Sequence, residues 1–141
     1  MVILLAMVTH GRSTDIGGMG AGGKADGKQF SFDLTAEVVK ETPAWMPNSS
    51  CPPLEPRQAI EIATKQLHGL VKDPSAWYFL QLNLVQFNGD HWAYIVVFDR
   101  HYPDDVAVTF GDYFQIPVLM SGATLEPKVS ALPRDVIEHS K

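Results

Sequence analysis

Residues Pro56–Leu70 alternate between apolar and polar side chains with the period of an α-helix. At about 100° per residue the apolar side chains fall on one side of the helical wheel. That side is formed by Ala59, Ile60, Ala63, Leu67 and Leu70. Pro56 suits a first helical turn, where its missing N–H is not needed, and the Asp73-Pro74 pair follows the end. A helix this short is marginal alone in water, so we expect it to dock on a sheet.

Two apolar strands, Trp77–Phe87 and His91–Arg100, follow the helix, and Asn88-Gly89 between them is typical of a β-hairpin. Two registers compete. A two-residue loop pairs Phe87 with Asp90, whereas a three-residue loop pairs Phe87 with His91. We favour the second, because it gathers polar residues on one face and places the leucines of the first strand beside Tyr94, Val96 and Phe98. A slip of one residue would exchange the faces.

The hairpin and the helix together predict an α+β fold, with one main helix packed on an antiparallel sheet of four or five strands. Ile95 and Val97 point away from the helix in the favoured register, so we expect His91–Arg100 to be a central strand that is apolar on both sides. The core that we expect consists of Ile60, Ala63, Leu67, Leu80, Leu82, Leu84, Tyr94, Val96 and Phe98.

Residues 1–28 predict an apolar start and a glycine-rich flexible leader. The run Val2–Val8 is similar to the apolar part of a signal peptide that has lost its basic beginning, and a disordered N-terminus is the alternative. Thr9–Lys28 shows no apolar period. It contains G-x-G-x-x-G from Gly18 to Gly23, but a strand pattern follows where both nucleotide-binding motifs need a helix. We therefore expect no nucleotide site.

Residues 29–127 predict the single α+β domain. Phe30–Val39 alternates as a one-sided strand, either in the sheet of the hairpin or over its second face. Pro43–Pro56 must be an extended loop, since proline does not fit regular ladders, and Trp45 is expected to anchor it on the core. Val106–Phe110 and Tyr113–Met120 predict a further strand region, and its Pro117 indicates an edge or a bulge.

The end of the chain has weaker patterns. Ser121-Gly122 predicts a turn, and Ala123–Glu126 a short return strand. Residues 128–141 are mostly polar, so we expect a C-terminal tail.

Charge and composition exclude several classes of function. The chain has 141 residues, a formal charge of −5 and an isoelectric point near 5.4, so an acidic surface argues against nucleic acid as a partner. No apolar stretch has the length of a membrane span. One cysteine, Cys51, forms no internal disulfide, which is compatible with a reducing compartment or with an exported chain.

The sequence predicts no catalytic, cofactor-binding or metal site. Cys51 has no base and orienting partner near it in the sequence. An enzyme would have to use His91, His101 and Asp104 or Asp105, and this requires the side chains to converge in one cleft. The spacing of these residues fits neither an EF-hand nor a zinc motif.

Residues 52–127 resemble the PepSY-like family. The resemblance is carried by Pro53-Leu-Glu-Pro-Arg-Gln-Ala59, by His91-Trp92-Ala-Tyr94 after Asn-Gly, and by Ile116-Pro-Val-Leu-Met-Ser-Gly122. Glu55 replaces the expected serine cap, and Ser121 replaces the aspartate that usually opens the turn. The resemblance implies a PepSY-like or cystatin-like helix on an antiparallel sheet, export from a bacterial cell, and contact with other proteins such as peptidases.

The favoured hypothesis is therefore a non-enzymatic binding or regulatory domain that is exported to the periplasm or secreted, with a protein partner and a possible homodimer. Its contact surface would be the second sheet face around Ile95 and Val97, or an exposed edge strand. The alternative is a carrier of a small ligand, with Trp77, Phe79, Trp92 and Tyr94 lining a cavity between helix and sheet.

Overall fold

The computed structural model describes residues 21–87, 89–102 and 113–133, and it confirms the α+β class. Its sheet has six antiparallel strands, slightly more than the four or five predicted. In chain order the elements are β1 Gly22–Ala25, β2 Lys28–Ser31, α1 Ala36–Lys40, α2 Pro56–Leu70, the 3₁₀ turn η2 Pro74–Ala76, β3 Trp77–Gln86, β4 Trp92–Arg100, β5 Phe114–Leu119 and β6 Lys128–Ala131.

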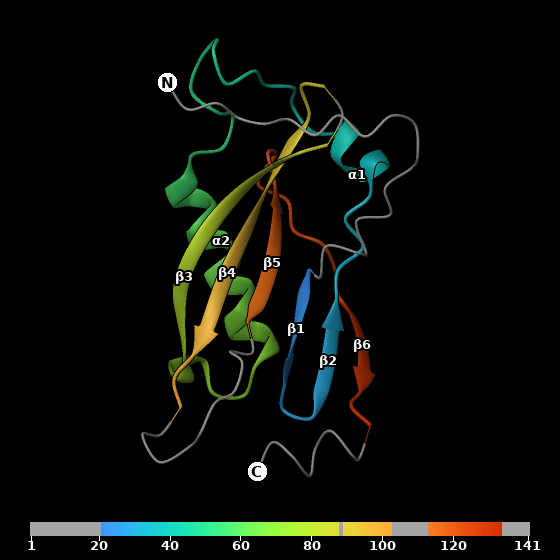
Figure 1. Ribbon diagram of the computed structural model, residues 1–141, viewed down its shortest axis with the longest axis vertical. Helices are drawn as coiled ribbons and strands as arrows, with labels where there is room; N and C mark the ends of the chain where they lie inside the picture. The colour runs from blue at the N-terminus through green and yellow to red at the C-terminus, as the bar shows by residue number, and fades with distance from the viewer. Residues whose placement is uncertain (1–20, 88, 103–112, 134–141) are drawn as a thin grey trace.

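The strands lie in the order β3-β4-β5-β1-β2-β6 (Figure 1). β3, β4 and β5 are long and pair along most of their length. The short strands β1, β2 and β6 form the other part of the sheet, which joins β5 through one register pair, Gly22 with Gln115. The two outer edges of the sheet are therefore β3 and β6.

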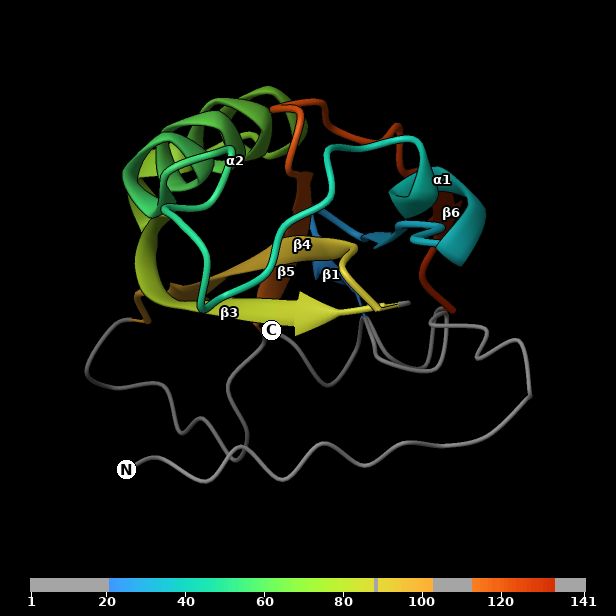
Figure 2. The ribbon, with the colours of Figure 1, turned by 90° about the horizontal axis from the view of Figure 1, so that it is seen from above.

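α2 has the predicted bounds and docks through the predicted side. It lies on one face of β3, β4 and β5 (Figure 2). Ala59, Ala63 and Leu67 on its inner side are fully buried, and Ile60 is half-buried. At its N-terminus the backbone N–H of Glu55 donates to the side-chain oxygen of Gln58 at 3.2 Å, so a capping box forms without a serine.

The three-residue hairpin loop is confirmed. The N–H of Phe87 donates to the carbonyl of His91 at 2.8 Å, and Leu84 and Leu82 pair with Tyr94 and Val96. A bulge between Phe79 and Gln81 then shifts the register. β4 is central, as predicted, and every side chain from Trp92 to Phe98 is buried.

Two residues of the predicted core are placed wrongly. Leu80 and Leu84 are 41% and 39% exposed, because β3 is the outermost strand and α2 does not extend over its edge. The periodicity showed that these leucines share a face with Leu82, but it did not show how far the helix covers that face. Leu82 is half-buried against the core, and Tyr94, Val96 and Phe98 are buried as predicted.

Residues 22–25, which the sequence placed in a flexible leader, form β1 instead. Gly23 lies so close to Phe114 that a β-carbon on it would be 2.7 Å from the phenylalanine ring. Gly22 has a φ of +139°, and a β-carbon there would overlap the carbonyl oxygen of Phe30. The glycines thus allow close packing of β1 rather than mobility. Val2–Val8 and Gly18 lie outside the described residues.

The prediction of one strand over Phe30–Val39 is correct only at its start. β2 ends at Ser31, and α1 begins after Thr35, whose hydroxyl accepts a bond from the N–H of Val38 at 3.2 Å. Leu34 and Val39 are buried in a second apolar cluster with Ala93, Ile95, Val97 and Leu119. This segment therefore covers the second face of the sheet, which is one of the two positions expected for it.

The proline-rich segment is a loop, as predicted, but it is not extended throughout, because it turns where the backbone N–H of Ser49 donates to the carbonyl of Met46 at 3.1 Å. Trp45 anchors this loop. The Trp45 ring meets the Trp92 ring edge-on at 5.7 Å, and the backbone N–H of Trp45 donates to the carbonyl of Asp90 at 2.7 Å. Further along, the buried hydroxyl of Tyr94 donates to the carbonyl of Leu54 at 2.8 Å. These contacts hold the loop across the end of the hairpin.

β5 carries Pro117 beside Ile95 of β4. On its other side β5 pairs only at Gln115 and through a bridge between Val118 and Thr124, so Pro117 lies where the outer ladder is interrupted. Thr124 belongs to the predicted return segment, which forms this bridge and no longer strand. Lys128–Ala131, expected in a tail, forms β6. Val106–Phe110 lies outside the described residues.

Candidate functional site

The outer strand β3 carries four of the seven large apolar side chains that are exposed in the described part of the chain, and it is a candidate contact surface. β3 has ten residues, Trp-Tyr-Phe-Leu-Gln-Leu-Asn-Leu-Val-Gln, with no charge and no proline. Tyr78, Phe79, Leu80 and Leu84 are each between 37% and 43% exposed. Long, uncharged and apolar edge strands are uncommon in folded proteins, because such edges pair with other chains.

The hairpin register shows which backbone groups of β3 face outward. Antiparallel pairs alternate between hydrogen-bonded and non-bonded, and Phe87 with His91 is a bonded pair. Val85 and Asn83 therefore also bond to β4. The N–H and C=O groups of Gln86, Leu84 and Leu82 point to the open side, where no described strand lies.

β6, at the opposite edge, differs in each of these respects. It has four residues, and its Lys128 forms an ion pair with Asp33 at 2.6 Å. Short edges that carry lysine are protected against pairing with another chain. Protection by short length and by lysine is thus present at β6, whereas β3 has neither and carries only the bulge between Phe79 and Gln81.

The prediction of a contact surface around Ile95 and Val97 is wrong. These side chains are only 7% and 4% exposed, because they pack against Leu34 and Val39. A hollow of about 50 Å³ remains beside them, lined by Ala21, Leu34, Asn83, Val85, Phe87, Ile95 and Gln115. That volume holds a water molecule or two, whereas ligand pockets are usually several hundred cubic ångströms.

The four aromatic residues expected around a ligand do not enclose a cavity. Trp92 and Tyr94 are 6% and 2% exposed, Phe79 is 43% exposed, and Trp77 packs edge-on against Phe114 at 5.6 Å. Facing them, Ala59 and Ala63 of α2 have no accessible surface. A side chain that lined a ligand-sized cavity would retain surface accessible to water, so the space between helix and sheet is filled by side chains.

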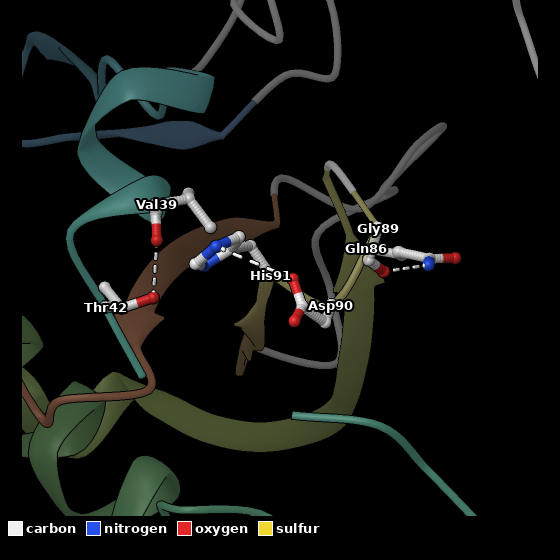
Figure 3. A network of polar contacts seen from close by, with 6 residues as sticks. All are labelled: Val39, Thr42, Gln86, Gly89, Asp90 and His91. Carbon is white, nitrogen blue, oxygen red and sulfur yellow. Dashed lines mark hydrogen bonds and ion pairs between the residues drawn. The ribbon is translucent and has the colours of Figure 1, made fainter. Parts of the chain in front are cut away.

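His91 and His101 lie at opposite ends of β4 and do not meet. The strand between them has nine residues, which separates its ends by about 30 Å at the usual rise. The Nε2 atom of His91 is 3.7 Å from an oxygen of Asp90, in the group of polar residues at the tip of the hairpin (Figure 3). There the hydroxyl of Thr42 donates to the carbonyl of Val39.

His101 belongs to a polar cluster at the other end of the hairpin. The hydroxyl of Tyr78 donates to Asp99 at 3.0 Å, and this bond to a carboxylate raises the pKa of Tyr78 above its usual value. The ring of His101 stacks on the ring of Tyr78 at 4.4 Å. Arg100 lies over the rings of Trp77 and Tyr102 at 5.9 and 5.8 Å. These contacts secure the end of the β3–β4 hairpin.

Within the described residues, the other candidates for catalysis, metal binding or phosphate binding do not form a site. Cys51 is exposed and free in the proline-rich loop. Asp104 and Asp105 lie outside the described residues. Among the side chains that the structure describes, no three of His, Cys, Asp or Glu are grouped closely enough to hold a metal ion. After Gly23 the chain continues as β1, so the helix that a phosphate loop needs does not follow.

Sequence reasoning named an exposed edge strand as a possible surface but did not identify β3. It assigned Leu80 and Leu84 to the core, where they would have been covered. The sequence of β3 contains no signal of an edge, because its ten residues include no lysine, glutamate, aspartate, arginine or proline. Strands at an open edge usually carry at least one of these residues.

No family model, curated protein or solved structure matches this chain. None of the helices in the described ranges has the length and the apolar character needed to cross a bilayer.

Proposed function

We propose that the protein is a non-enzymatic binding domain that takes an extended segment of another polypeptide along the free edge of β3. The observation that carries this proposal is the uncharged ten-residue edge, with the outward backbone groups of Leu82, Leu84 and Gln86. Addition of a strand to such an edge is a recurrent mode of peptide recognition, in which main-chain bonds supply affinity and alternating side chains supply specificity.

The two faces of β3 define the segment that would fit. On the side of α2, the exposed Leu84 offers apolar contact beside Leu82. On the other side, Gln81 and Asn83 are exposed and polar, and the amide of Gln81 donates to Asn83 at 3.4 Å. A segment with alternating apolar and polar residues therefore complements this edge, and a segment with a proline at a bonded position does not.

The proposed compartment and the proposed class of partner are inferred from the sequence alone. Export to the periplasm or secretion is inferred from the apolar run Val2–Val8, and a peptidase as partner is implied by the PepSY-like resemblance of residues 52–127. Both belong to the proposal. A rigid domain that presents one open strand is physically suited to such regulatory contact, because the edge is held in place by β4 and by the buried cluster around Tyr94.

A peptide selection with a blocked edge tests the proposal. Random peptides of about ten residues are displayed against the full chain immobilised at low density, and bound sequences are titrated against Leu84→Pro. This variant removes an outward N–H and leaves the bonds of β3 to β4 in place. Val129→Pro is the matched control, because Val129 is an exposed aliphatic residue whose N–H faces the open side of β6.

We expect the wild type to enrich peptides with alternating apolar residues. Leu84→Pro should weaken their binding at least tenfold, and Val129→Pro should leave it unchanged. The amides of Leu82, Leu84 and Gln86 should exchange with solvent more slowly when peptide is bound than in the same chain without peptide. Equal binding to Leu84→Pro and wild type, or no enrichment of any sequence, would contradict the proposal.

A further inference from the structure

We infer that a second copy of this chain occupies the free edge of β3, with the two β3 strands antiparallel about a two-fold axis at Asn83. This inference rests on the proposed function and names the partner at the same edge. The contact would join the two six-stranded sheets into one continuous sheet.

Asn83 of β3 has a leucine on each side, Leu82 and Leu84. In an antiparallel pair centred there, Leu82 lies opposite Leu84 of the second copy, and Leu84 opposite its Leu82. Both residues have outward N–H and C=O groups, so each pair is a hydrogen-bonded one. Leu84 would gain apolar contact on the side of α2, and its 39% exposure would fall.

On the other face Asn83 lies directly opposite Asn83 of the second copy. This pair is non-bonded in its backbone, which brings the two side chains close, and two amides can donate to and accept from each other. Gln81 lies opposite Val85 of the second copy and is adjacent to the amide pair. The polar residues of β3 thus meet around the axis.

Charge favours a copy of the same chain at this position. A two-fold axis at Asn83 places the residues at the middle of β3 close to their own copies, so a charge at one of these central positions would face a like charge. β3 carries none, although the whole chain has a formal charge of −5. The acidic charge of the chain lies on other segments, and the strand that would meet itself is neutral.

The geometry also limits assembly to two copies. An isologous contact uses the same edge on both molecules, so pairing β3 with β3 leaves no long open edge among the strands that the structure describes. The remaining edges are the two β6 strands, each four residues long with Lys128 in an ion pair. Growth into a fibre would need those edges, and their length and charge oppose it.

A charge-complementation experiment on the full chain tests this register. Asn83→Lys and Asn83→Glu each place a charge opposite itself across the axis, while both substitutions are at an exposed position of the monomer. Mass is measured by sedimentation equilibrium for each variant, for their equimolar mixture and for the wild type, from about 1 µM to about 1 mM. Ser130→Lys on β6 is the matched control, because it adds the same charge at an exposed position of the other edge.

We expect the wild type and Ser130→Lys to form dimers of twice 15.6 kDa. Each Asn83 variant should raise the dissociation constant about fivefold or more, and the mixture should return it to the wild-type value or below. Circular dichroism and a cooperative unfolding transition in all variants would show that the fold is retained. A loss of dimer caused by misfolding would not be restored by mixing.

A wild type that stays monomeric throughout this range overturns the inference, as does a mixture that does not recover or an Asn83 variant that dimerises like the wild type. These outcomes are separable from the proposed function. A monomer that still binds selected peptides, and loses them with Leu84→Pro, retains the function and lacks only the self-association. A chain that neither dimerises nor binds peptides at this edge contradicts both.

Discussion

Gly23→Ala tests whether β1 is a packed strand or part of a flexible leader. A β-carbon on Gly23 would lie 2.7 Å from two ring carbons of Phe114 and 3.0 Å from its α-carbon, whereas carbon atoms in contact are usually about 3.5–4.0 Å apart. The ring has little room to retreat. Phe114 is fully buried, with the rings of Phe30 and Trp77 at 5.4 and 5.6 Å.

These contacts determine whether Gly23→Ala raises or lowers the free energy of unfolding. In a leader without contacts, alanine would replace glycine at no cost to the fold. In β1 the added methyl must displace Phe114 or separate β1 from it, and overpacking of this kind costs about 1–3 kcal/mol. With a typical urea dependence of about 2 kcal/mol per molar, the unfolding midpoint of Gly23→Ala should fall by about 0.5–1.5 M.

Urea unfolding followed by circular dichroism measures this change, and Gly69→Ala supplies the control. A β-carbon on Gly69 meets nothing within 4 Å and lies in α2, so alanine there should stabilise the protein by about 0.5–1 kcal/mol. The two glycine-to-alanine changes thus have opposite signs. A Gly23→Ala midpoint equal to or above that of the wild type would refute the packing of β1 on Phe114.

Three further predictions concern the core and the loop. Tyr94→Phe removes the bond to the carbonyl of Leu54 and should lower the free energy of unfolding by about 1–3 kcal/mol in the same assay, since the buried carbonyl loses its donor. Burial raises the pKa of Tyr94 above 10.0, so its contribution is complete below pH 10 and is lost as the pH rises through the folded-state pKa. The unfolding midpoint of the wild type should therefore decline more steeply than that of Tyr94→Phe in this range, and parallel curves would contradict the assignment. Trp45→Ala should cost about 1–3 kcal/mol and make the proline-rich loop more susceptible to proteolysis, and an unchanged cleavage rate would argue against the anchor. Leu80→Ser should stay within about 0.5 kcal/mol of the wild type, whereas Val96→Ala should cost about 2 kcal/mol, and similar losses at both positions would show that the edge is covered.

The accurate sequence predictions concern elements whose contacts are close in the chain. Helix α2 has the predicted bounds, because its apolar spacing and Pro56 act within a few residues of one another. The hairpin register could likewise be derived from the residues on either side of Asn88-Gly89, because a slip by one would have exposed the buried face. These are local constraints, and they predict the class of the fold and most of its core.

The errors share one cause, which is contact between distant segments. Gly22 and Gly23 read as a linker because glycine weakens an isolated strand, and only the proximity of Phe30 and Phe114 shows why glycine is needed there. The sequence from Phe30 to Val38 alternates as a strand would, but β2 ends at Ser31, and Leu34 and Val39 pack against the distant Ile95 of β4 instead.

The sequence by itself determined one amphipathic helix, a hairpin in a single register and an uncharged strand at Trp77–Gln86, since periodicity, turn residues and charge are properties of neighbouring positions. Only the tertiary structure decided that this strand is the outermost one and that Leu80 and Leu84 are exposed on it. The physical reason is that strand order and the extent of helix coverage depend on which distant segments pack together. An edge becomes a candidate binding surface only once its neighbours are known.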